Sequence, residues 1–148
     1  MDLEQRLFNE NIKVTSFAKR VYAYSIDELL VSLIIFGAFF NQFMAVAGNM
    51  MALISLINSM FFYFFVLKTA YHTIFIYMYG KTIGKMVARV RTINIYTLDK
   101  PNLQTSFLRA VVRNFDEMLF YLGMLYALVN PLTQAFHDKI SKVIVVDD

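Results

Sequence analysis

One uncharged run of residues constrains this chain more than any other feature of its sequence. From Leu29 to Leu67 there are 39 consecutive residues without an Asp, Glu, Lys or Arg. As a single helix this run would be about 58 Å long at 1.5 Å per residue, almost twice the roughly 30 Å hydrocarbon core of a bilayer. The run therefore predicts two membrane-spanning helices joined by a turn.

The composition excludes several classes of protein. The chain has 148 residues, of which 58% are hydrophobic and 17% charged, and these values argue against a soluble globule. The net charge of +3 does not indicate nucleic-acid binding, because no basic segment is interleaved with exposed aromatic residues. The absence of Cys excludes a disulfide framework, a thiolate zinc site and a Cys nucleophile.

We predict an all-α membrane fold in one transmembrane domain, residues 1–148. Two spans at about 21–43 and 51–77 form a hairpin, and a third apolar segment covers about 107–134. The connector between the first two spans has no Lys or Arg, whereas the N-terminal stretch and the loop at 80–106 are basic. The positive-inside rule therefore places the N-terminus and this loop in the cytoplasm.

The N-terminal stretch is charged and lacks the apolar core of a signal peptide. We expect it to be retained, with residues 1 to about 16 forming an amphipathic surface helix that has Leu3, Leu7 and Phe8 on one side. Residues 88–97 and 142–147 have the pattern of two strands that pair in the cytoplasm. If they pair, the segment at 107–134 re-enters the membrane as a bent hairpin, and otherwise it crosses once; both alternatives stay open.

Charged residues flank the uncharged run on both sides. Folding the run back on itself brings Asp27 or Glu28 to the depth of Lys68, so we expect an ion pair there. An unpaired charge at mid-depth costs roughly 2.5–3.5 kcal/mol on insertion scales. His72 lies four residues beyond Lys68 and shares its helical face.

The third apolar segment begins with a similar set of charges. Arg109, Arg113, Asp116 and Glu117 lie at helical spacings near its start. Two interpretations remain open for the charged residues: ion pairs that hold the segments together, or a hydrated path for a proton or cation. The candidate residues for this polar cluster are Arg20, Asp27, Glu28, Lys68, His72, Arg113, Asp116 and Asp138. The sequence indicates no catalytic, cofactor-binding or metal-binding residues, and we predict that the chain is not an enzyme.

Three sequence blocks stand out: residues 19–30 (KRVYAYSIDELL), residues 80–90 (GKTIGKMVARV) and residues 134–140 (QAFHDKI), the last of which precedes a valine-rich strand. Together they resemble the RDD family of bacterial membrane proteins. The first block is similar to the start of the family's first span, the second to its block after the second span, and the third to its closing His-Asp-Lys-Ile pattern. Position by position, the family's naming residues correspond to Arg20, Asp27 and Asp138, with Asp116 as the other candidate for the third position.

The resemblance implies a multi-pass protein of the bacterial inner membrane, and transport, including cation/proton exchange, has been suggested for some members. We therefore expect a small cation/proton transporter or a component of one, which works in the lipid bilayer as a homo-oligomer or in a larger complex. The alternative is a non-catalytic accessory or assembly subunit of a membrane complex. The residues Glu28 and Lys68 are particular to this chain and take no meaning from the family.

Overall fold

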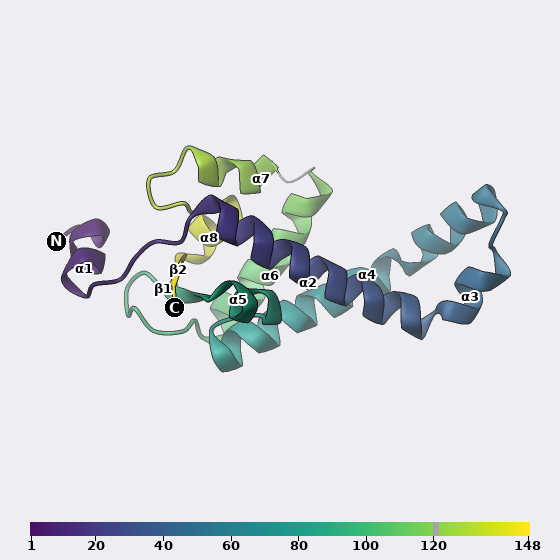
Figure 1. Cartoon of the computed structure of the whole chain (residues 1–148), viewed down its shortest axis with the longest axis horizontal. Coiled ribbons are helices and arrows are strands. Elements are labelled where there is room, and N and C mark those ends of the chain that lie inside the picture. The colour runs from purple at the N-terminus through teal and green to yellow at the C-terminus, as the bar shows by residue number, and fades with distance from the viewer. Residues whose placement is uncertain (120–121) are drawn as a thin grey trace.

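A long helical hairpin forms the apolar part of the protein. The computed structural model describes residues 1–119 and 122–148. Helix α2 (Phe17–Ala38) begins after Ser16, whose side chain accepts a hydrogen bond from the Lys19 N–H. Helix α3 (Phe40–Ala45) forms the tip, and helix α4 (Met50–Tyr79) returns and ends at Gly80. Figure 1 shows this tip projecting at the opposite end of the molecule from the N-terminal helix and the sheet.

The hairpin confirms the prediction of two long apolar helices, with shifted bounds. Helices α2 and α4 contain 22 and 30 residues, and both are long and apolar enough to cross a membrane. The first helix starts at Phe17 and breaks at Phe39, where φ is −112° and ψ is 24°, so it does not continue to residue 43. At 1.5 Å per residue α4 is about 45 Å long, which exceeds the hydrocarbon core of a bilayer.

Two short helix–strand units follow the hairpin and pair with each other. Helix α5 (Ile83–Ala88) leads into strand β1 (Val90–Asn94), and helix α8 (Phe136–Ser141) leads into strand β2 (Val143–Asp147). The strands are antiparallel, with Val90 opposite Asp147 and Asn94 opposite Val143. In each unit a single basic residue in the left-handed conformation, Arg89 or Lys142, joins helix to strand. The predicted pairing of the two strands is thus confirmed.

The sheet is buried on both faces. One face packs in a cluster of Leu7, Ile93, Ile144 and Val146, and the other face packs against Ala23 of α2. Leu7 belongs to helix α1 (Leu3–Asn9), so the N-terminal helix covers the sheet. The prediction that Leu7 and Phe8 lie on the same apolar side of this helix is confirmed for Leu7, which is buried, and wrong for Phe8, which is 83% exposed.

The third apolar segment is a broken, folded-back structure. Helix α6 (Leu103–Met118) is followed by α7 (Leu122–Leu125) and a 3₁₀ turn, η1 (Tyr126–Leu128), before α8 packs back against α6. The predicted segment at about 107–134 thus contains most of α6 together with α7 and η1, and whether it crosses a membrane or re-enters stays a prediction. Helix α6 is strongly amphipathic, and its buried face carries Arg109, Arg113, Asn114 and Asp116. This polar face requires cover by protein, and α4 and α8 supply it.

Helix α5 approaches α2 closely at Gly84. A Cβ atom on Gly84 would lie 2.1 Å from the carbonyl oxygen of Ala23 and 2.9 Å from the Asp27 carboxylate. No side chain fits in this space, so residue 84 must be glycine for the loop to pack on the helix. This contact places the α5 N-terminus beside the charged part of α2.

We predict that Gly84→Ala destabilises the protein by about 1–3 kcal/mol, the usual cost of overpacking, because the added methyl group meets backbone atoms. Thermal unfolding of the detergent-purified protein measures this loss. The matched control is Gly37→Ala in α2, where a Cβ atom meets nothing within 4 Å. Equal unfolding midpoints for both variants would contradict the contact.

Candidate functional site

Asp138 joins three helices by ionic contacts. Its carboxylate pairs with the Arg20 guanidinium of α2, and it accepts a 2.8 Å hydrogen bond from Nε of Arg109 in α6. It also accepts a 3.3 Å hydrogen bond from the Ala135 N–H at the start of its own helix, α8. All three charged side chains are buried. A buried pair of this kind fixes the relative positions of its elements, because separating it leaves uncompensated charge.

The electrostatics around Asp138 favour its ionised form. Burial alone would raise its pKa, but the Arg20 and Arg109 guanidiniums hold the pKa well below its ordinary value. Next to it, burial is the main cause that lowers the pKa of His137 to about 4, so this imidazole is neutral near pH 7. His137 lies 3.5 Å from Asp138 and 3.7 Å from Asp116. Asp116 in turn accepts a 2.6 Å hydrogen bond from the Gly123 N–H.

Asp27 is held by neutral donors and has no basic partner within 4 Å in the described part of the chain. One oxygen accepts hydrogen bonds from the Tyr71 hydroxyl at 2.7 Å and the Gly84 N–H at 2.8 Å. The other oxygen accepts one from the Thr82 hydroxyl at 2.6 Å. Asp27 is 2% exposed. These bonds fasten α4 and the start of α5 to the middle of α2.

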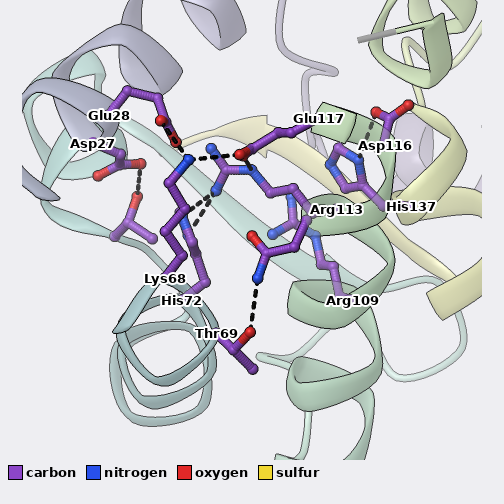
Figure 2. A network of polar contacts seen from close by, with 12 residues as sticks. Asp27, Glu28, Lys68, Thr69, His72, Arg109, Arg113, Asp116, Glu117 and His137 are labelled. Atoms are coloured by element: carbon purple, nitrogen blue, oxygen red, sulfur yellow. Dashed lines mark hydrogen bonds and ion pairs between the residues drawn. The ribbon is translucent and has the colours of Figure 1, made fainter. Parts of the chain in front are cut away.

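Lys68 lies between two carboxylates. Figure 2 shows its ammonium group between Glu28 of α2, at 2.7 Å, and Glu117 of α6, at 2.6 Å. The prediction that Lys68 meets Asp27 or Glu28 is confirmed for Glu28. The three side chains remain 12–22% exposed. Beside them is a cavity of about 290 Å³ between α4 and α6, lined by Phe61, Phe64, Phe65, Lys68, Asn114, Glu117 and Met118.

Arg113 links this group to His72. Its Nη1 atom lies 2.6 Å from Nδ1 of His72, and its guanidinium lies 4.4 Å from the ring centroid of Tyr24. A guanidinium donates only to a ring nitrogen that carries no proton. The pairing therefore requires a neutral His72. Arg113 also lies 3.8 Å from Glu117, four residues along α6.

The eight candidate residues fall into three sets of contacts. Arg20 and Asp138 pair with each other, and His137 lies between Asp138 and Asp116. Glu28, Lys68, His72 and Arg113 form a second set, which Glu117 connects. Among the described residues, Asp27 forms hydrogen bonds only with ones outside the candidate list. Within residues 1–119 and 122–148, no three His, Asp or Glu side chains are grouped to hold a metal ion, and the absence of catalytic and cofactor sites stays a prediction.

Several contributing residues were not among the candidates, including Tyr71, Thr82, Lys85, Arg109 and Glu117. Arg109 and Glu117 lie at helical spacings from Arg113, and this signal was present in the sequence. Lys85 gave no such signal, because a lysine in a basic loop is ordinarily exposed. It is buried instead and bonds to the Thr92 hydroxyl. Burial and the nearby Arg109 lower the pKa of Lys85 well below its ordinary value.

The fold and this buried polar cluster define a class of protein: a small membrane protein with two long apolar helices and a module of two paired helix–strand units. The family model of the RDD family matches residues 14–142. The chain therefore belongs to the RDD family, as its three sequence blocks predict.

One curated relative is similar over part of its length. The chain is 29% identical over 77 residues to "Uncharacterized protein RP437" of Rickettsia prowazekii (strain Madrid E). The match covers 52% of this chain and 42% of that protein. No solved structure matches the chain.

We predict that Asp138→Asn destabilises the protein by about 3–5 kcal/mol, because it leaves two buried guanidiniums without their counter-charge. Thermal or denaturant unfolding of the purified protein measures the change. Lys19→Gln is the control, since Lys19 forms an ion pair with Asp147 while 47% exposed, and such surface pairs contribute about 0–1 kcal/mol. A loss no larger than that of the control would contradict a central role for Asp138.

Proposed function

We propose that this RDD protein is a small membrane transporter, or a component of one, that exchanges a proton for a small cation at the Glu28–Lys68–Glu117 group. The observation that carries the proposal is one ammonium shared by two carboxylates next to a cavity of about 290 Å³. No enzymatic reaction is part of the proposal. Ionisable groups at membrane depth are expensive and commonly mark ion or proton pathways.

The arrangement of charges supports exchange. In the described part of the chain, Oε1 of both Glu28 and Glu117 accepts no hydrogen bond, whereas each Oε2 contacts Lys68. One carboxylate holds the ammonium while the other takes up a proton or a cation. The proton or cation that binds compensates the carboxylate charge that the single ammonium leaves over.

The deeper carboxylates have a different role in this proposal. Asp27 and Asp138 are almost completely buried, and fixed donors occupy the oxygens of both. Each of their four carboxylate oxygens already has a hydrogen-bond or ion-pair partner among the described residues. We therefore assign these two residues to structural support of the exchange group.

A transport pathway needs further helices. Only 6% of the most apolar stretch of α4 is buried within the chain, and α2 packs mainly on α5 while α4 packs mainly on α6. In the described part of the chain, α2 and α4 thus make few contacts with each other. We propose that copies of the chain, or another membrane subunit, complete the path in the bacterial inner membrane.

Reconstitution tests the exchange directly. In liposomes that contain a pH-sensitive dye, a sodium or potassium gradient should drive proton flux through the protein. Glu28→Gln and Glu117→Gln should each reduce the flux about tenfold or more, the factor that corresponds to about 1.4 kcal/mol. Glu10→Gln, at an exposed position after α1, is the control. Absence of cation-dependent flux in the wild type, or equal flux in all variants, would refute the proposal.

A second candidate function is a non-catalytic accessory or assembly subunit of a larger membrane complex. The uncovered apolar surface of α2 and α4 favours it, because helices of a partner could pack there as well as lipid. Affinity purification in a gentle detergent followed by native mass spectrometry should then recover a partner chain in a fixed ratio. Recovery of this chain alone, as monomer or homo-oligomer, would remove the basis of this candidate.

We propose that the N-terminus and the loop at 80–106 face the cytoplasm and that the hairpin tip faces outward. The N-terminal stretch and the loop at 80–106 contain many Lys and Arg residues, and the hairpin tip contains none. Basic residues are enriched on the cytoplasmic side of membrane proteins. The chain has no Cys, so single cysteines report their own position. In intact cells Asn49→Cys should react with an impermeant thiol reagent, while Lys100→Cys and Lys142→Cys should react only after permeabilisation. External labelling at position 142 would establish three crossings.

A further inference from the structure

A second, smaller cavity lies on the side of α2 that faces α5, α6 and the sheet. Its volume is about 30 Å³. Its lining residues are Arg20, Ala23, Tyr24, Asp27, Lys85, Val90, Arg109, Arg113, His137 and Val145. Four basic side chains thus meet around a space whose remaining walls are partly apolar. Apolar walls lower the local dielectric constant and strengthen any charge interaction inside the cavity.

Four basic side chains line this cavity, whereas among the described residues Asp27 is the only carboxylate on its wall. Arg20 and Arg109 share the single carboxylate of Asp138. Lys85 is 8% exposed, and within the part of the chain that the structure describes it forms no ion pair and bonds only to the Thr92 hydroxyl. Asp27 lies on the cavity wall, but both its oxygens already accept hydrogen bonds from neutral donors.

One donor at this cavity lacks a partner. Nη1 of Arg20 is buried and makes no hydrogen bond to any described residue, although Nη2 of the same guanidinium pairs with Asp138. The side chain of Arg20 is 6% exposed. A buried charged donor without an acceptor is costly, so proteins normally supply an acceptor.

We propose that this cavity binds one small monovalent anion of the size of chloride, held by Arg20 and Lys85 with Arg109 and Arg113 nearby. The anion accepts the free Arg20 N–H and compensates the surplus positive charge. A water molecule needs about 10–15 Å³ of such space, so 30 Å³ has room for one chloride ion or about two waters. Larger anions such as gluconate do not fit.

This site is separate from the exchange group and serves a different purpose. The cavity beside Lys68 is lined by α4 and α6, whereas the anion cavity is lined by α2, α5, α6, α8 and both strands. The bound anion connects the two helix–strand units, α5–β1 and α8–β2, to the N-terminal half of α2. The site therefore makes assembly of these elements depend on chloride.

Thermal unfolding of the full-length, detergent-purified protein tests this proposal. Sodium chloride is compared with sodium gluconate at equal ionic strength and pH, so that screening of surface charges is the same. At a chloride concentration ten times Kd, binding shifts the folding equilibrium about elevenfold, which should raise Tm by about 3–6 °C. Bromide should act like chloride. Equal Tm values in chloride and gluconate for the wild type would overturn the proposal and would indicate that water fills the cavity.

Two lysine variants locate the site. Lys85→Met should lose the difference between chloride and gluconate. Lys81→Met is the matched control in the same loop, because Lys81 pairs with Asp148 and does not line the cavity, and it should keep the full difference. Loss of the chloride response in Lys81→Met as well would assign the effect to the surface and overturn the site.

A direct measurement does not depend on the variants. Crystals of the wild-type protein grown in bromide should show an anomalous scattering peak in contact with Arg20 and Lys85. If Lys85→Met does not fold, this peak decides the question. Absence of a peak at this cavity, in crystals where the cavity residues are ordered, would refute the assignment.

Discussion

The cost of placing a charge in an apolar environment determines how this protein is built. Asp138 is fully buried, and it can stay ionised there because Arg20 and Arg109 come to it from two other helices. Arg20 is 118 positions away in the sequence. Formation of this ionic contact thus requires that the first span, α6 and the C-terminal module already have their final arrangement. The same requirement makes the contact a strong determinant of a unique fold.

Two buried carboxylates in this fold are stabilised in different ways. Asp138 is matched by full positive charges, while Asp27 is solvated by two hydroxyl groups and a backbone N–H. The first arrangement resists protonation, and the second supplies hydrogen bonds to the carboxylate without drawing a basic side chain away from its own partner. Gly84 is the backbone donor in the second arrangement. Its lack of a side chain therefore serves electrostatics as much as packing.

Local patterns predicted three features. The length of the uncharged run predicted the hairpin, and the alternating residue pattern predicted the strand pairing. The equal depth of Lys68 and residues 27–28 in the hairpin predicted the contact of Lys68 with Asp27 or Glu28. The partner of Arg20 could not be found in this way, because Asp138 is 118 positions away in the sequence and the contact depends on how α8 folds back. The burial of Lys85 could not be predicted from the sequence for a similar reason, because tertiary packing determines whether a loop lysine is exposed. The break in α2 at Phe39 also had no strong signal, because no proline stands there and Gly37, two residues earlier, lies within the helix.

The two helix–strand units have the internal symmetry of a duplicated element. Each has a six-residue helix, one left-handed residue and a five-residue strand, and the strand register maps each unit onto the other about an axis through the Thr92–Val145 pair. Under this pseudo-twofold operation Lys85 corresponds to Asp138. A symmetric pair of identical side chains would place like charges on both sides of the axis. This chain instead has residues of opposite charge type, a lysine and an aspartate, at the two equivalent positions. The backbones of the two units are therefore related by symmetry, and their side chains are not.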